Sequence, residues 1–169
     1  MLLNCGNWYD WNSGERQACY RLDFLGKRER KWVQYNTLPY SMCALGQSGI
    51  GASSGLFGFS NSSSAFLPKG SNSWLELKNP SNSSFYFSCA VSISSSELLV
   101  MGGSWYWDEA HGRQVWKLKI SDNLTSHEWT KMKDLKTARW GHGCSLHSTK
   151  YHEKYIIVAG NDVCNNENE

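Results

Sequence analysis

The sequence predicts an all-β fold of short antiparallel strands, and three observations carry that prediction. Several segments alternate apolar and polar residues with a period of two. Glycine, serine and asparagine recur between these segments, whereas long runs of strong helix formers are missing from the sequence. Aromatic residues make up 14% of the 169-residue chain, which is typical of a folded core, and this length fits one domain.

Internal repeats set the register of these strands. Tryptophan recurs at Trp32, Trp74 and Trp129, and each of the last two is followed 15 residues later by a cysteine, Cys89 and Cys144. A match in both residue type and spacing is the signature of a repeated unit. The chain is therefore expected to contain several copies of one supersecondary structure.

Four strands are expected in each repeat. Residues 114–120 alternate strictly and indicate a half-buried strand, as do residues 18–24 in another copy. Residues 98–101 and 155–159 are apolar on both faces, which predicts inner strands packed between two neighbouring sheets. The other two strands are expected around the repeat cysteine and from the repeat tryptophan onward.

A glycine pair and a tryptophan complete the pattern. Gly102 and Gly103 follow the apolar strand directly, and we expect positive φ there because the strand must stop and the chain must bend. Trp129 is expected to place a large apolar ring from the outer strand against the next sheet.

Taken together, these features resemble the kelch repeat. An apolar run into Gly102 and Gly103, then Trp129, Arg139 and a further inner strand reproduce its pattern. The resemblance implies a β-propeller of four-stranded blades. About three blades are too few to close, so we expect residues 1–169 to form one partial kelch β-propeller, part of a six-bladed one, whose remaining blades are its partner. The expected divisions are the end of one blade over 1–40, a degenerate blade over 41–82, a complete blade over 83–137 and the first strands of the next over 138–169.

Six cysteines allow 15 pairings, but position narrows them. Cys5 ends one strand and Cys19 lies on the next, across a loop of 13 residues, which predicts a disulfide between opposed residues of a hairpin. Cys89 and Cys144 occupy equivalent places in two repeats, and we expect buried free thiols there. Cys43 and Cys164 stay unassigned.

Three sequons, at Asn61, Asn82 and Asn123, are candidate N-glycosylation sites in expected loops. The cysteines of the first repeat are similar to those of secreted kelch propellers of invertebrates, so an extracellular location is expected, with the cytoplasm as the alternative. Residues 1–3 lack the features of a secretory signal, which leaves either an intracellular protein or a missing start.

Composition excludes two classes of partner. The net charge is +2, and the basic run at residues 27–31 has no aromatic ladder beside it, so nucleic acid is not expected. The longest apolar stretches fall far short of the roughly 20 residues that span a bilayer, so no membrane span is expected.

No catalytic residue, metal or cofactor is expected. The pattern over residues 51–55 matches a nucleophile elbow but has no helix behind it. His142 and Cys144 lack a second pair at zinc spacing, so a structural histidine is expected. Asp108, Glu109 and His111 form a polar loop cluster of the kind that loops commonly carry.

Aromatic loops are the most informative feature for function. Residues 7–11 and 104–108 follow the glycine positions of two different repeats, and both segments combine aromatic and acidic residues. Because such loops would reach one end of a propeller, we expect them to anchor a protein partner, although they could equally fold over blade edges. Arg139 would point to the same end, with a buried structural arginine as the alternative. The candidate partner-binding residues are Trp8, Tyr9, Trp11, Trp105, Tyr106, Trp107, Asp108 and Arg139.

The sequence therefore favours a non-catalytic protein-interaction module. Two alternatives stay open, because a fold does not determine a function. Some kelch-type propellers are sugar-acting enzymes of the oxidase or sialic-acid isomerase class. Others form the substrate-binding part of a ubiquitin-ligase adaptor.

Overall fold

A computed structural model describes residues 2–5, 18–25, 29–37, 55–59, 63–68, 70–104, 108–121, 126–149 and 153–160. Within residues 2–37 it describes the backbone and the side chain of Lys31 only. All statements below concern these parts of the chain.

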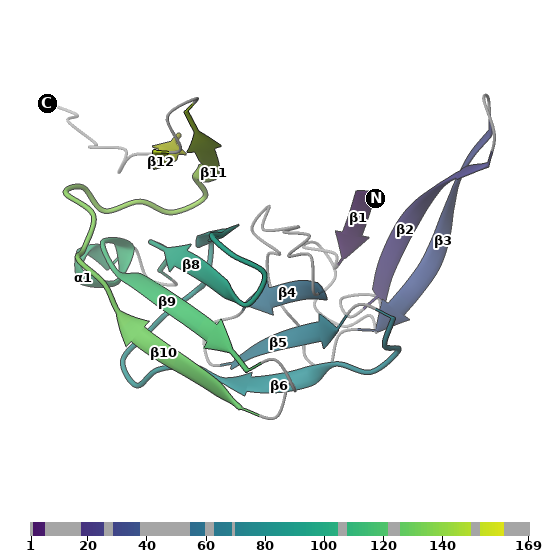
Figure 1. Ribbon diagram of the computed structural model, residues 1–169, viewed down its shortest axis with the longest axis horizontal. Helices are drawn as coiled ribbons and strands as arrows, with labels where there is room; N and C mark the ends of the chain where they lie inside the picture. The colour runs from purple at the N-terminus through teal and green to yellow at the C-terminus, as the bar shows by residue number, and fades with distance from the viewer. Residues whose placement is uncertain are drawn as a thin grey trace, which may run out of the picture.

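The described residues form twelve strands and one short helix (Figure 1). In chain order the elements are β1 (Leu2–Cys5), β2 (Ala18–Leu25), β3 (Glu29–Thr37), β4 (Gly55–Phe59), β5 (Ser63–Pro68), β6 (Leu75–Lys78), β7 (Cys89–Ser92), β8 (Glu97–Met101), α1 (Glu109–Gly112), β9 (Val115–Ile120), β10 (His127–Lys131), β11 (Gly143–Ser148) and β12 (Lys154–Ala159).

The strands form four antiparallel sheets of sequential neighbours. Their orders are β1-β2-β3, β4-β5-β6, β10-β9-β8-β7 and β11-β12. Each strand pairs with the one before or after it in the chain, as in a meander. The all-β prediction is confirmed. One sheet, β7 to β10, contains the four strands that the repeat predicts, with the strand from Trp129 outermost.

Strand β8 of the sheet β7–β10 is buried on both faces, because its residues alternate between two apolar clusters. Leu98 and Val100 belong to a cluster shared with the phenylalanines of β4 and β5. Leu99 and Met101 belong to a second cluster, against which Ile156 and other residues of β11 and β12 pack. An inner strand between two neighbouring sheets is therefore confirmed for β8.

Strand β12 differs from β8 on its outer face. Its residues Ile156 and Val158 pack toward β8, but Tyr155 and Ile157 are 50% and 51% exposed. The expectation that this apolar strand is covered on both faces is thus wrong for the described part of the chain, where one face has no sheet upon it.

Trp129 packs against the preceding sheet, not the next one. Its ring centroid lies 5.1 Å from that of Phe85 and 6.5 Å from that of Phe59 on β4, and its indole N–H donates to the carbonyl of Lys78, 2.9 Å away. The reason is register: Trp129 pairs with Leu118, whose side chain belongs to the cluster on the β4–β6 side. The expected direction was wrong, although the expected apolar contact is present.

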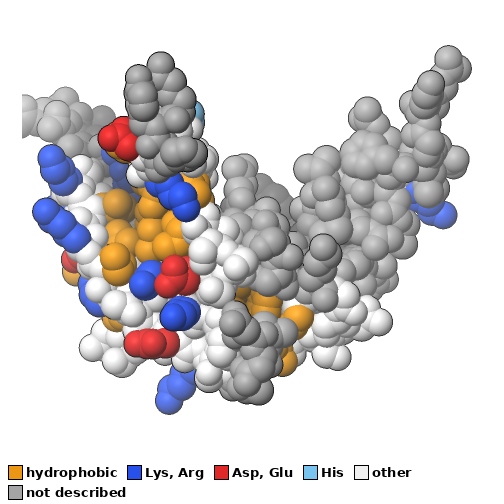
Figure 2. All heavy atoms as spheres, in the orientation of Figure 1, with side chains coloured by type: hydrophobic (Ala, Val, Ile, Leu, Met, Phe, Trp, Pro, Cys, Tyr) orange, Lys and Arg blue, Asp and Glu red, His pale blue; other side chains and the backbone are white. Residues whose placement is uncertain are grey.

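On the visible surface over β8–β10, charged side chains lie scattered among hydrophobic ones (Figure 2). Lys117 and Glu97 form an ion pair across neighbouring strands at 3.3 Å, and the Lys131 ammonium lies 5.2 Å from the centre of the Trp116 ring. Such partly exposed pairs contribute little to stability, on the order of 0–1 kcal/mol each. No helix among the described residues is both long and apolar enough to cross a membrane.

Candidate binding face

Three connections meet at one end of the sheet β7–β10. In the antiparallel register Cys89 opposes Met101, Met101 opposes Val115, and Trp116 opposes Lys131. The β6–β7, β8–β9 and β10–β11 connections therefore leave the sheet at the same end. We call their described residues, 79–88, 102–104, 108–114 and 132–142, the loop end.

The glycine pair fixes the base of the loop end. Gly102 and Gly103 have φ of +63° and +91°, as predicted, and their N–H groups donate to the carbonyls of Gln114 and Arg139, both at 2.8 Å. A Cβ on Gly102 would lie 2.4 Å from the Arg139 carbonyl oxygen, and one on Gly103 would lie 2.6 Å from that of Tyr86. Only glycine permits this close approach of all three connections.

Backbone hydrogen bonds continue between the connections. Arg139 donates to the carbonyl of Gly112, and Leu135 donates to that of Arg113, both at 2.8 Å. Gly141 donates to Phe87 at the same distance. Each connection is thus tied to its neighbour by backbone hydrogen bonds.

One hydrogen bond joins Ser104 and Asp108, the described residues on either side of the aromatic segment, residues 105–107. The backbone N–H of Asp108 donates to the hydroxyl oxygen of the buried Ser104 at 2.8 Å. Trp105, Tyr106 and Trp107 lie between these two residues and outside the described part of the chain. The aromatic residues expected to act with them, Trp8, Tyr9 and Trp11, also lie outside it.

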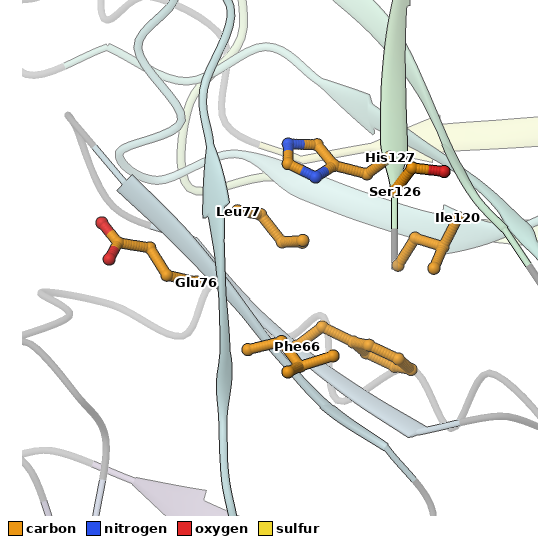
Figure 3. Close-up of a pocket in the computed structure, with 7 residues that line it drawn as sticks. Phe66, Glu76, Leu77, Ile120, Ser126 and His127 are labelled. Carbon is orange, nitrogen blue, oxygen red and sulfur yellow. The ribbon is translucent and has the colours of Figure 1, made fainter. Parts of the chain in front are cut away.

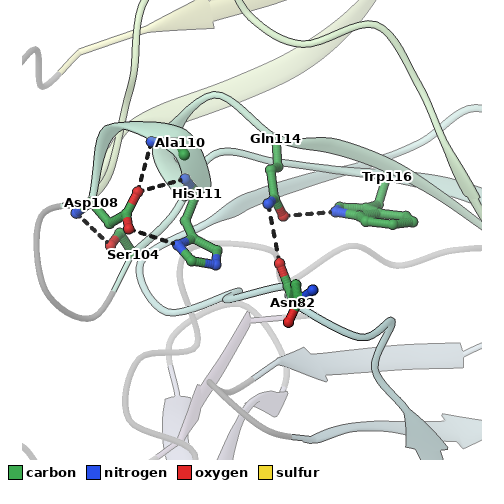
Figure 4. Close-up of polar contacts among 7 residues, drawn as sticks. All are labelled: Asn82, Ser104, Asp108, Ala110, His111, Gln114 and Trp116. Atoms are coloured by element: carbon green, nitrogen blue, oxygen red, sulfur yellow. Dashed lines mark hydrogen bonds and ion pairs between the residues drawn. The ribbon is translucent and has the colours of Figure 1, made fainter.

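Asp108 caps the short helix α1, which replaces the loop expected there. One carboxylate oxygen accepts from the N–H groups of Ala110 and His111 at 2.7 and 3.1 Å, and the other lies 3.3 Å from Nδ1 of His111 (Figure 4). The hydrogen bond from the His111 backbone leads the interactions that lower the pKa of Asp108. Asp108 is therefore an ionised helix cap, engaged within its own loop.

A chain of hydrogen bonds joins the start of β9 to the β6–β7 connection. The indole N–H of Trp116 donates to the side-chain oxygen of Gln114 at 2.9 Å, and the amide of Gln114 donates to the backbone carbonyl of Asn82 at 3.1 Å (Figure 4). Asn82 is exposed at a turn. The other two sequon residues, Asn61 and Asn123, lie outside the described residues.

Arg139 is engaged within the protein. Its guanidinium donates to the carbonyl of Gly160, just after β12, at 2.7 Å, so it joins the loop end of one sheet to the next sheet. Its half-buried side chain thus has the contact that the structural alternative requires. Its backbone N–H and carbonyl also bond to other connections, as described above.

His142 lies under the loop end. The side chain is only 5% exposed, and neither ring nitrogen has a hydrogen-bond partner. A Cβ on Gly102 would lie 2.7 Å from Cε1 of the His142 ring. Burial, with the nearby Arg139 charge, lowers its pKa to about 4, so the ring is neutral at neutral pH. The described residues contain no group of three or more His, Cys, Asp and Glu placed to hold a metal ion.

Cys89 and Cys144 form a disulfide, which corrects the expectation of free thiols. Cys89 opposes Met101 in register and Cys144 opposes Val158, and these two partners lie on the faces where the β7–β10 and β11–β12 sheets meet. The cysteines therefore face each other and are not equivalent positions of a repeat.

The described residues leave the pairing of the other four cysteines untested. Cys5 and Cys19 are register partners on β1 and β2, which is the arrangement their predicted disulfide needs; their side chains are not described, so the bond stays a prediction. Cys43 and Cys164 lie outside the described residues.

A pocket of about 190 Å³ lies at the opposite end of the sheet, between β6 and the β9–β10 hairpin (Figure 3). Its floor is apolar and buried, and in Figure 3 the carboxylate of Glu76 points away from Leu77 and Ile120. Polar groups do not converge in it. Its lining residues are Phe66, Leu75, Glu76, Leu77, Ile120, Ser126 and His127.

The fold and site together define an all-β protein of antiparallel sheets with a hydrogen-bonded loop end. No protein-family model, curated protein or solved structure matches the chain.

Proposed function

We propose that this chain is part of a kelch-type β-propeller that binds a protein partner through its loop end. The proposal has two parts, one for the architecture and one for the binding, and they rest on different observations.

The alternating burial of the β7–β10 sheet supports the propeller. This sheet contacts one sheet through Leu98 and Val100 and another through Leu99 and Met101. Sheets that pack face to face in chain order, each a meander, are the construction of propeller blades. The exposed face of β12 at Tyr155 and Ile157 is the position at which a following blade would pack.

The hydrogen bond between Ser104 and Asp108 is the observation that carries the binding proposal. It joins the residues on either side of Trp105, Tyr106 and Trp107, and Gly103 ties the same segment to Arg139. Anchoring both ends restricts the conformations that the segment between them can adopt, which lowers the entropy cost of binding. Tryptophan and tyrosine are also the side chains most often found to dominate binding energy.

Affinity capture tests the proposal. The immobilised full chain would be used to capture binding proteins from extracellular fluid and from cell extract. The Kd of each captured protein would then be measured for wild type and for the triple variant Trp105→Ser, Tyr106→Ser, Trp107→Ser. The matched control is Leu75→Ser, which changes an exposed apolar side chain of β6 at the opposite end of the sheet.

We expect the triple variant to weaken binding by at least about 30-fold, since one hot-spot tryptophan contributes roughly 2 kcal/mol, and the control to bind as wild type does. Thermal unfolding of the variants shows whether the fold is intact. A well-folded triple variant that binds every captured protein with wild-type affinity would contradict the proposal.

A further inference from the structure

The exposed turn at Asn82 borders the loop end. Its backbone carbonyl accepts from Gln114 at 3.1 Å, and the carbonyl of Gln114 in turn accepts from Gly102 at 2.8 Å. Two hydrogen bonds thus separate this turn from the glycine pair that precedes the aromatic segment. Figure 4 shows Asn82 beside Gln114 and Trp116.

The backbone of the turn is held in place while Asn82 stays exposed. Asn82 has φ of +59°, a left-handed conformation that asparagine tolerates better than most residues. The turn is closed by Ser83, whose N–H and hydroxyl both donate to the carbonyl of Pro80, at 3.3 and 2.8 Å. The backbone is therefore held while the Asn82 residue stays exposed.

Residues 82–84 read Asn-Ser-Ser and satisfy the acceptor pattern, which requires a residue other than proline in the middle and a hydroxyl at the third position. Residues 79–81, Asn-Pro-Ser, are excluded by their proline. Ser84 is buried, and its hydroxyl has no hydrogen-bond partner. An enzyme that reads this hydroxyl must act before the segment folds, whereas the folded protein has only to leave Asn82 exposed.

The disulfide supplies the independent observation. Cys89 and Cys144 are bonded across two sheets, and Cys89 is 4% exposed. Disulfides of this structural kind form in the oxidising secretory pathway and are rare in the reducing cytosol. That pathway is also where acceptor asparagines meet the oligosaccharide donor.

We propose that Asn82 is N-glycosylated and that its glycan borders the loop end. In the transfer, the side-chain amide nitrogen of Asn82 attacks the anomeric carbon of a lipid-diphosphate-linked oligosaccharide. The new carbon–nitrogen bond replaces the bond from that carbon to the phosphate oxygen, the lipid diphosphate leaves, and the amide proton passes to a base of the transferase.

A glycan at this turn restricts how a partner can approach. It would occupy the part of the loop end formed by residues 79–88 and leave the part formed by α1 open. This consequence rests on the proposed binding function, but the glycan itself does not, so the experiment reads the glycan alone.

The test is translation of the full chain behind a cleavable leader in the presence of microsomes, followed by peptide mapping after glycosidase treatment in heavy-oxygen water. The enzyme converts a glycosylated asparagine to aspartate and labels it with heavy oxygen. Wild type is compared with Asn82→Gln, with Ser84→Ala, which destroys the acceptor pattern, and with the matched control Ser83→Ala, which keeps it. Ser84→Thr keeps a hydroxyl at residue 84 and serves as the conservative counterpart of Ser84→Ala.

We expect label at residue 82 in wild type, Ser83→Ala and Ser84→Thr, and its loss in Ser84→Ala. Asn82→Gln should carry one glycan fewer than wild type. Because the reaction precedes folding, a variant that folds poorly still reports. Recovery of unlabelled Asn82 from the translocated wild-type chain would overturn the proposal, whatever the binding experiment shows.

Discussion

Removal of the Cys89–Cys144 disulfide by a Cys89→Ala, Cys144→Ala double substitution should strongly destabilise the protein. The bond joins residues 55 positions apart. In the chain-entropy treatment, a loop of that size gives about 4 kcal/mol of stabilisation at 25 °C, because the crosslink restricts the unfolded chain.

The assay is urea unfolding of the oxidised chain and of the double variant, with thermal unfolding alongside. We expect the free energy of unfolding to fall by about 4 kcal/mol and Tm to fall by about 8–16 °C for a chain of this size. The control is Ser145→Ala, an exposed neighbour of Cys144 on the same strand, which should change the free energy by less than about 0.5 kcal/mol.

Direct mapping of the oxidised chain accompanies the assay. A peptide that contains both Cys89 and Cys144 should appear without reductant and separate with it. If both thiols are found free, or if the double variant unfolds at the urea concentration of wild type, then β7 and β11 do not meet in the manner described.

Three further results are expected. Gly102→Ala should lower the free energy of unfolding by more than the roughly 1–2 kcal/mol of left-handed strain, because its Cβ would lie 2.4 Å from the Arg139 carbonyl oxygen. Gly70→Ala, at φ of +81° with nothing within 4 Å of the added Cβ, should cost that strain alone. Equal losses for the two variants in urea unfolding would refute this reasoning. The pKa of His142 is lowered from 6.5 to about 4 in the folded protein, so between these pH values the unfolded chain binds more protons. The free energy of unfolding should therefore decrease as the pH falls from 6.5 toward 4, by up to about 1.4 kcal/mol per pH unit. His142→Gln should flatten this part of the pH profile, and an unchanged slope would count against a buried neutral ring. The double variant Tyr155→Ser, Ile157→Ser should show less self-association than wild type in sedimentation velocity, because these side chains form an exposed apolar face of β12. The control Met132→Ser should self-associate as wild type does. If wild type, the double variant and the control all sediment as monomers, this face does not associate.

The strands could be predicted because their signals are local. The alternation of residues 115–120 and the apolar run of β8 report burial of one face or both at each position, without knowledge of the neighbours. The glycine pair likewise announces a bend through its own conformational freedom. These features placed β8, β9 and β12 within one residue of their observed bounds, whereas β10 begins two residues before Trp129, where it was expected to start, and β11 was expected only around Cys144.

The errors arose where the answer depends on which faces meet. Cys89 and Cys144 have similar sequence surroundings, so they were taken as equivalent, but register places them on opposed faces of neighbouring sheets. Trp129 follows Leu118 to the preceding sheet for the same reason. Neither direction is encoded in a period of two.

The loop end was only partly predictable. Asp108 followed by Glu109 carries a helix-start signal, an N-cap residue and an acid in the first turn, but four residues are too few to show helical periodicity. The hydrogen bonds that join Gly103, Arg139 and Gly112 link positions far apart in the sequence. They arise only when the sheets have assembled, so no local pattern could have indicated them.

A crystal structure of the oxidised chain would test the central claim most directly. It should show the β7–β10 meander between two other sheets, with Trp129 against Phe85 on one side and the Cys89–Cys144 bond on the other. A structure in which β7–β10 and β11–β12 form one continuous sheet, or in which residues 97–101 are helical, would contradict it.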